Sequence, residues 1–287
     1  MWIQDFYNWF FLQEGRTPEG YMSWQHLVSV TITILIFFSF AIFLGIKFKN
    51  NKKGQTGTLL GFGIALVFVY LLKTADIIVS AIIKENIQEL GMSLANNIPI
   101  FLCDITIVMV PIAALTKGKV REVCCDFICT WGLVMGLVGN YLAGNIYSSF
   151  CVVSFPTMIS LLNHTLSGAV TVFLFITKLA KLDIKNIPFN LGILYIVMFV
   201  ALVVDYALRI NTGGGQNYMF FFGGDGTPYD LIMMLTQNSY LVYQRLVFIL
   251  QTLYVFAFYG IYHLILAIIT KSKSKNVKNE IETATNA

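Results

Sequence analysis

Long runs of apolar residues fill most of the chain, and short polar stretches separate them. A helix needs ~20 residues to cross the ~30 Å hydrocarbon core of a membrane, and seven of the runs approach or exceed that length. The alternating pattern that marks the strands of a membrane barrel does not occur in the sequence. The pattern predicts an all-α fold, a polytopic bundle of seven transmembrane helices. The expected spans are Leu27–Phe48, Thr58–Ile83, Ile98–Thr116, Cys124–Ile146, Pro156–Thr177, Phe189–Ile210 and Leu246–Thr270.

Composition excludes an ordinary soluble protein. Of the 287 residues, 57% are hydrophobic and 12% are charged, whereas about 25% of the residues in soluble domains are charged. No soluble segment is long enough to bind nucleic acid, and lysines between the apolar runs account for the net charge of +4. We therefore expect a multi-pass integral protein of the cell membrane.

Three parts of the chain are distinguished by their polarity. Residues 1–25 lack the basic start and cleavage site of a signal peptide, and their aromatic side chains predict a short helix lying in the outer interface. Residues 26–270 form the transmembrane domain. Residues 271–287 are rich in Lys, Asn and Ser, which predicts a disordered cytoplasmic tail.

The distribution of Lys and Arg predicts the orientation. Fourteen of them lie in the loops after the first, third and fifth runs and in the tail, and four, Lys84 among them, lie on the opposite side. Cytoplasmic loops carry the excess of positive charge in membrane proteins. The N-terminus is therefore expected outside and the C-terminus in the cytoplasm.

Four charged residues lie within the apolar runs, away from their ends: Lys73, Asp76, Asp104 and Asp205. A charge at the centre of a membrane helix costs at least ~2.5 to 3.5 kcal/mol, so such residues usually face a bundle interior or a cavity. Lys73 and Asp76 are close enough in sequence to neutralise each other, as are Asp205 and Arg209. Asp104 has no such neighbour in its own run.

Several polar residues share one depth when positions are counted inward from the outer end of each run. At 1.5 Å per residue they lie roughly 8 to 12 Å below the outer boundary. The set comprises Asp76, Cys103, Asp104, Asn140, His164 and Asp205. Polar residues with unrelated structural roles would show no common depth, so the counting predicts one polar layer in the outer leaflet.

Cys103 and His164 are the chemically reactive pair in this layer. A thiol becomes a nucleophile when an imidazole takes its proton, and the imidazole needs an acceptor that orients it. Both residues also have structural interpretations, because free cysteine is common in cores and a helical histidine often only hydrogen-bonds a neighbouring helix. The candidates for the orienting acceptor are Asp76, Asp104, Asn140 and Asp205.

The outer loop over residues 211–244 is long and rich in glycine, but it matches no phosphate-binding pattern. Its apolar stretch 218–222 is expected to dip back toward the polar layer as a lid. Asn217, Tyr218 and Phe220 are therefore candidates to contact a substrate. The other cysteines lack the spacing of a zinc site. We expect neither a metal nor another cofactor.

Three separated motifs resemble those of one family. Residues 97–104, with the sequence NIPIFLCD, are similar to a PLHLCD-type motif, and residues 162–165, LNHT, are similar to a histidine motif of the fifth helix. Residues 217–220 and 226–228 resemble an outer-loop motif. The family is that of YwaF and transmembrane protein 164. This chain has Phe101 where many bacterial members have His, and Asn163 where a second His often precedes the matched one.

The resemblance implies a seven-helix fold in which a buried cysteine and histidine serve acyl transfer. Animal members are linked to placing acyl chains on ether phospholipids, a specificity that we do not carry over. By the same resemblance, Cys103 is the acyl-accepting nucleophile, and His164 acts first as general base and then as general acid.

The expected function is therefore that of an acyltransferase acting on phospholipid or lysophospholipid acyl chains through a cysteine acyl-enzyme. If water reached the thioester, the protein would be a lipid hydrolase. A second class of function is a transporter or binding protein in which Asp76, Asp104, Asp205 and His164 line a path for an ion or small solute. A third is a structural membrane subunit.

Overall fold

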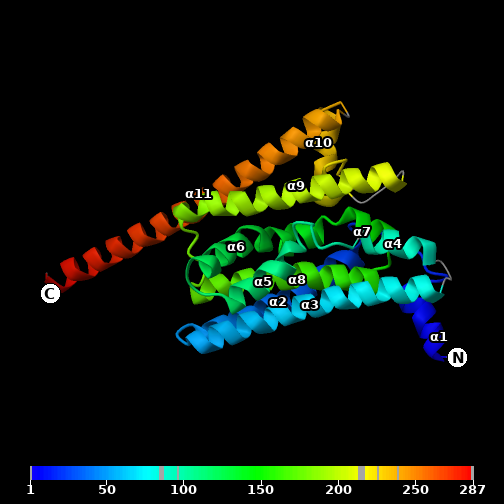
Figure 1. The fold of residues 1–287 in the computed structure, drawn as a ribbon. Helices are drawn as coiled ribbons and strands as arrows, with labels where there is room; N and C mark the ends of the chain where they lie inside the picture. The colour runs from blue at the N-terminus through cyan, green and yellow to red at the C-terminus, as the bar shows by residue number, and fades with distance from the viewer. Residues whose placement is uncertain are drawn as a thin grey trace.

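The structure is a computed structural model that describes residues 2–83, 87–95, 97–212, 217–224, 226–237 and 239–285. All regular elements within these residues are helices (Figure 1). In chain order they are α1 (Trp2–Tyr7), η1 (Asn8–Leu12), α2 (Trp24–Phe48), α3 (Lys52–Ile83), α4 (Ile87–Ala95), α5 (Ile105–Leu115), α6 (Gly118–Tyr141), α7 (Gly144–Ser149), α8 (Phe155–Thr177), η2 (Ile184–Asn186), α9 (Ile187–Thr212), η3 (Tyr218–Phe220), α10 (Tyr229–Leu235) and α11 (Tyr240–Thr285).

Six helical stretches in the described residues are long and apolar enough to cross a membrane. They contain α2, α3, α6 with α7, α8, α9 and the first part of α11. They coincide with six of the seven spans expected from the sequence. The prediction of an all-α, multi-pass membrane protein is therefore confirmed, whereas the count of seven is not. The orientation and the choice of the cell membrane remain predictions.

The expected third span, Ile98–Thr116, is only partly helical. Turns and bends occupy residues 97–104, and α5 then runs for 11 residues. Pro99 explains the change, because proline lacks a backbone N–H and disfavours helical geometry in the residue before it. This corrects the expectation of one continuous helix. It also places Cys103 and Asp104 at the end of an irregular segment, directly before α5.

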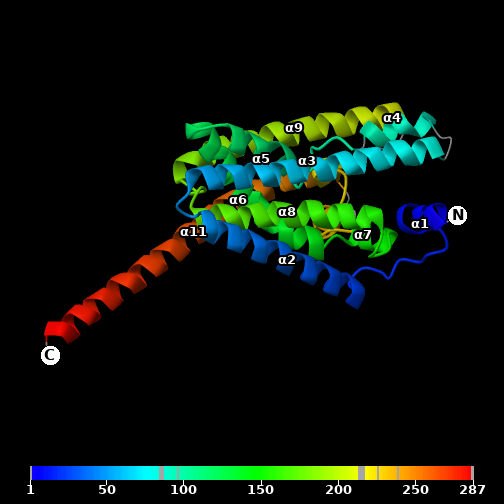
Figure 2. The same cartoon turned by 90° about the horizontal axis from the view of Figure 1, so that it is seen from below.

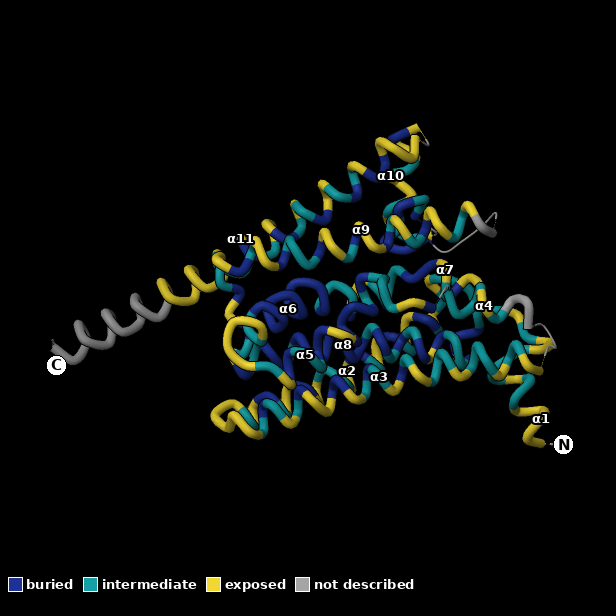
Figure 3. The backbone as a smooth tube through the Cα atoms, viewed as in Figure 1, coloured by how far each residue is buried: buried dark blue, intermediate teal, exposed yellow. Residues whose placement is uncertain are grey.

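Helix α8 lies at the centre of the bundle and packs against α2, α3 and α6. Buried residues are concentrated along α6 and α8 (Figure 3). Glycines permit the close approach of these two helices: a Cβ added at Gly136 would lie only 2.7 Å from the Cα of Gly168. Thr171 of α8 also donates a hydrogen bond to the Ile128 carbonyl of α6, at 3.1 Å. Small residues and interhelical hydrogen bonds are the usual means of packing membrane helices.

Helices α9 and α11 contact each other and cover one side of α6 (Figures 1 and 2). Helix α11 is assigned as far as Thr285. The disorder expected after residue 270 remains a prediction.

The N-terminal segment contains the expected short helix, formed by α1 and η1. It is anchored to the segment before α8, because Gln13 accepts a hydrogen bond from the Cys151 N–H at 2.6 Å and Arg16 donates to the Val153 carbonyl at 2.7 Å. Its position in the membrane interface remains a prediction. Lys84 and residues 213–216 of the expected glycine-rich loop lie outside the described residues.

Candidate functional site

A cavity of about 790 Å³ lies among α3, α6, α8, α10 and α11. Its walls are mostly apolar, and Cys103 and His164 both line it. The charged side chains in its wall are Lys73, Asp76 and Asp104. The volume falls within the ~300 to 1,000 Å³ that is typical of ligand pockets. The cavity therefore contains both residues of the expected reactive pair and three of the four predicted intramembrane charges.

Cys103 is half-buried, and its thiol donates a hydrogen bond to Oδ1 of Asp104, with 3.8 Å between the sulfur and the oxygen. Asp104 is 8% exposed and accepts a hydrogen bond from Nδ2 of Asn163 at 2.7 Å. Thr106 donates to the Cys103 carbonyl at 2.8 Å and thereby holds the start of α5. Asp104 thus links the segment that holds the thiol to α8.

His164 follows Asn163 on α8, and its ring packs against Gly139 of α6. A Cβ added at Gly139 would lie 3.0 Å from Cδ2 and 3.2 Å from Nε2 of the imidazole. The Nδ1 atom is buried and has no hydrogen-bond partner among the described residues. The expected acceptor that would orient this ring is therefore not observed there, and Nδ1 is available to a group that enters the cavity.

Lys73 and Asp76 lie on α3, and both side chains line the cavity. The Lys73 ammonium interacts electrostatically with Cys103, Asp104 and His164. Neutralisation of Asp76 by Lys73 remains a prediction. Lys73 brings a positive charge to the same space as the thiol and the imidazole.

Asn140, a predicted member of the polar layer, is not among the residues that line the cavity. Its amide donates to the Gly136 carbonyl at 2.9 Å and to the Thr165 hydroxyl at 3.0 Å. Its own carbonyl lies 3.1 Å from Nε2 of His26. Asn140 therefore connects α6 with α8 and α2.

Asp205 is fully buried on α9 and accepts a hydrogen bond from the Tyr218 N–H at 3.1 Å. The Tyr218 hydroxyl donates to the Ala95 carbonyl at 2.7 Å, and burial raises the pKa of this phenol. Asn217 donates to the Gly223 carbonyl and accepts from the Phe222 N–H, both at 2.7 Å. Asp205, Asn217 and Tyr218 thus fix the path of the outer loop and do not line the cavity.

Part of the expected lid does reach the cavity. Met219 and Phe220 line it, and both have positive φ angles, of 56° and 60°. Residues other than glycine adopt such angles only where the surrounding structure holds them. The Phe220 ring stacks on the Tyr229 ring, with 5.4 Å between the ring centroids, and its centroid lies 6.2 Å from that of Phe101.

Sequence reasoning missed Trp131 and Gln251, which line the cavity from α6 and α11. Gln251 could have been predicted, because it lies five residues from the outer end of the seventh expected span, at the depth of the expected polar layer. Asp126, in the first half of α6, is fully buried. It accepts hydrogen bonds from the backbone N–H groups of Lys181 and Leu182, at 3.0 and 2.9 Å.

The sequence profile described as the TMEM164 family matches residues 21–271. This range covers every described residue that lines the cavity. No curated protein and no solved structure is significantly similar to the chain. The match confirms the resemblance to transmembrane protein 164, and it has no bearing on YwaF or on a particular activity.

Proposed function

The chain belongs to the TMEM164 family, and we propose that it is an acyltransferase that moves acyl chains between membrane lipids through a thioester on Cys103. The observation that carries this proposal is the shared cavity. A nucleophile, a base and a positive charge line one space with mostly apolar walls, among helices that have the length and composition to cross a membrane. A site that binds a lipid ester needs an apolar pocket for the acyl chain and a few polar groups beside the reacting carbonyl carbon.

In the first half-reaction, His164 removes the proton of the Cys103 thiol, and the thiolate attacks the carbonyl carbon of a lipid ester. The new C–S bond forms as the C–O bond to the lysolipid breaks. His164 then returns its proton to the departing oxygen. The acyl chain remains on Cys103 as a thioester, and a lysolipid leaves.

In the second half-reaction, a hydroxyl group of an acceptor lipid attacks the thioester. His164 takes the hydroxyl proton, the C–O bond forms as the C–S bond breaks, and the proton passes to Cys103. Water in place of the acceptor would give a free fatty acid by the same steps. Transferase and hydrolase thus differ only in what reaches the thioester.

The neighbouring charges have opposite effects on the thiolate. The Asp104 carboxylate lies beside the Cys103 thiol, and a like charge at short range disfavours a second anion. The Asn163 hydrogen bond spreads the charge of Asp104, and Lys73 supplies a counter-charge. In this proposal Lys73 also stabilises the negative oxygen that develops during attack on the carbonyl.

The solute-path alternative receives less support from the geometry. Its expected residues were Asp76, Asp104, Asp205 and His164, and Asp205 is not among the residues that line the cavity. Asp205 instead accepts a hydrogen bond from the backbone of the outer loop.

The test is to trap the acyl-enzyme. Purified protein is incubated with phosphatidylcholine that carries an isotopically labelled acyl chain, quenched in acid, and weighed intact. Wild-type protein should gain one acyl group, and Cys103→Ala should gain none. Cys124→Ala is the matched control, because this buried thiol does not line the cavity. Failure of the wild type to acquire an adduct, or an adduct that persists in Cys103→Ala, would overturn the proposal.

His164→Gln is the second arm of the experiment. General-base catalysis typically contributes ~10² to 10⁴-fold, so the rate of adduct formation should fall by at least about 100-fold. A variant that forms the adduct at the wild-type rate would remove His164 from the mechanism.

A further inference from the structure

Two buried side chains in the cavity wall have polar atoms without hydrogen-bond partners. Trp131 on α6 is 4% exposed and Gln251 on α11 is 3% exposed. Within the described part of the chain, neither Nε1 of Trp131 nor Oε1 of Gln251 has a partner. Leaving a buried donor or acceptor unsatisfied is costly, and native structures seldom retain one without a reason. Both residues line the cavity, so a ligand that enters it can satisfy both atoms.

Trp131 lies at the contact between α6 and α11, beside the face of α11 that carries Gln251. The Trp131 ring lies 4.6 Å from the ring of Tyr254, which is three residues after Gln251 and therefore on the same face of α11. The Tyr254 hydroxyl cannot serve Gln251, because it donates to the Thr130 carbonyl at 2.5 Å. Gln251 shares a side-chain hydrogen bond with Tyr229, and its Oε1 is left without a partner among the described residues, as is Nε1 of Trp131. Both atoms are therefore available to one ligand.

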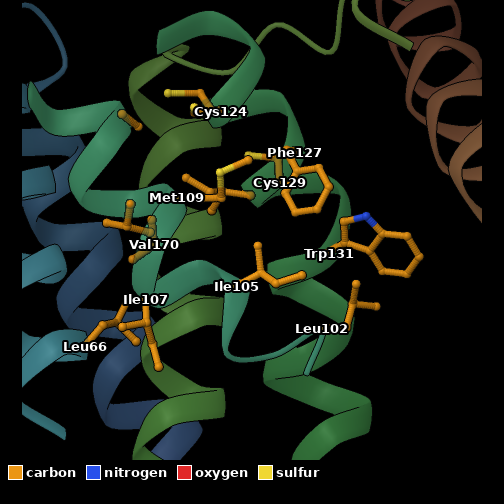
Figure 4. Packing of buried hydrophobic residues seen from close by; sticks show 14 of the residues in the cluster. Leu66, Leu102, Ile105, Ile107, Met109, Cys124, Phe127, Cys129, Trp131 and Val170 are labelled. Atoms are coloured by element: carbon orange, nitrogen blue, oxygen red, sulfur yellow. The ribbon is translucent and has the colours of Figure 1, made fainter. Parts of the chain in front are cut away.

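Trp131 lies near the segment that carries the nucleophile. Trp131 and Leu102 are members of one buried cluster, and the Trp131 ring points away from Val170 and Leu66 (Figure 4). Leu102 directly precedes Cys103. Trp131 therefore connects the wall formed by α6 and α11 with the segment that positions the thiol.

The chemistry of the pair selects a neutral group. An indole N–H only donates and an amide oxygen only accepts, and a hydroxyl group satisfies both at once. The charged residues of the lining, Lys73, Asp76 and Asp104, come from α3 and from the segment before α5. Among the described lining residues, those from α6, α10 and α11 carry no charge. This wall is therefore suited to an uncharged hydroxyl rather than to a phosphate or an ammonium.

We propose that Trp131 and Gln251 form a subsite that binds the hydroxyl group of the acyl acceptor, a glycerol lipid. The assignment rests on the proposed acyl transfer and extends it, because it identifies the residues that hold the acceptor hydroxyl. The hydroxyl is held here until the thioester has formed on Cys103. It then turns to His164, gives up its proton, and its oxygen forms the new ester bond as the C–S bond breaks.

A binding experiment tests the subsite without requiring activity. Native mass spectrometry compares the occupancy of the protein by a monoacylglycerol and by the same lipid with both hydroxyls methylated. Wild-type protein should prefer the hydroxylated lipid by about fivefold to tenfold, the ratio expected for about one net hydrogen bond. Gln251→Met keeps the approximate size of the side chain and removes the acceptor. Trp131→Phe keeps an aromatic ring, although a smaller one, and removes the donor. Both variants should lose the preference. Equal occupancy of the two lipids in the wild type would overturn the assignment.

Kinetics then separate the subsite from the catalytic pair. Both variants should form the Cys103 thioester at the wild-type rate, and their KM for an acceptor should rise by about fivefold to tenfold. Lysophosphatidylcholine and monoacylglycerol should show the same rise, because both carry a glycerol hydroxyl and they differ in the phosphocholine headgroup. A rise for lysophosphatidylcholine alone would place the contact at its headgroup and overturn the assignment, as would unchanged KM values for both.

The matched control is Tyr195→Phe. It also removes a polar group at the interface of α9 and α11, a hydroxyl 2.7 Å from Thr252, but Tyr195 does not line the cavity. Its acceptor KM and its lipid preference should equal those of the wild type. If the wild-type protein forms no thioester, the acyltransferase proposal fails, whereas the lipid preference still decides whether the hydroxyl subsite exists.

Discussion

Replacing Gly139 by alanine perturbs the position of the His164 ring while leaving the identity of both reactive residues unchanged. The added Cβ would lie 3.0 Å from Cδ2 and 3.2 Å from Nε2 of the imidazole. Comfortable contacts between such atoms are ~3.5 to 4.0 Å, so the ring must move by roughly 0.5 Å. A misplacement of 1 Å at a catalytic group can cost ~100-fold. We therefore expect the rate of thioester formation on Cys103 to fall by about tenfold.

The fold should survive this substitution. Alanine is more favourable than glycine inside a helix by about 1 kcal/mol, and the three nearest atoms that the new methyl group meets all belong to the ring of one side chain. Gly136→Ala is the contrasting variant, because its Cβ would lie 2.7 Å from the Cα of Gly168. A backbone atom cannot rotate away from the clash as a side chain can. Gly136→Ala should lower the thermal stability. Gly61→Ala is the control, since its Cβ would meet no atom within 4 Å.

The assay measures two quantities on the same three variants. Acid quench and intact mass give the rate of thioester formation, and a thermal shift in detergent gives the melting temperature. Gly139→Ala should be slow and stable, Gly136→Ala less stable, and Gly61→Ala unchanged in rate. A Gly139→Ala protein that is as fast and as stable as the wild type would refute the reasoning that the ring position limits the reaction.

Three other predictions concern the fixed parts of the bundle. Asp126→Ala leaves three backbone donors, those of Lys181, Leu182 and Asp183, without their acceptor. At ~1 to 3 kcal/mol for each donor, this should lower the free energy of unfolding by about 3 to 9 kcal/mol, measured by denaturation in mild detergent. Asn140→Ala removes hydrogen bonds to Gly136 and Thr165 and should lower the melting temperature without abolishing thioester formation in the protein that remains folded. Asp205→Ala releases the Tyr218 N–H and should speed amide hydrogen exchange in residues 217–222, while exchange in α8 stays slow; equal exchange in both proteins would show that Asp205 does not hold the loop.

Much of the fold could be predicted because membrane helices must satisfy their own backbone hydrogen bonds, which makes long apolar runs a direct signal. The exception is the segment before α5. Hydropathy treats residues 98–104 as part of a span, but Pro99 prevents a continuous helix, and irregular backbone is tolerated at this depth only where protein or a cavity surrounds it. Cys103 and Asp104 line such a cavity. The break in the helix and the position of the candidate site thus have the same cause.

Counting depth predicted which polar residues share a level but could not tell which way each side chain points. On α6, the positions that line the cavity are spaced by three and four residues, as on one face of a helix. They are Trp131, Val134, Met135, Val138 and Gly139. Asn140 lies off this stripe and faces Thr165 instead. The rotation of α6 is set by the close contact of Gly136 with Gly168, which only the packed structure reveals. That contact turns Trp131 and Gly139 toward the cavity, and with them the proposed hydroxyl subsite and the surface that supports His164.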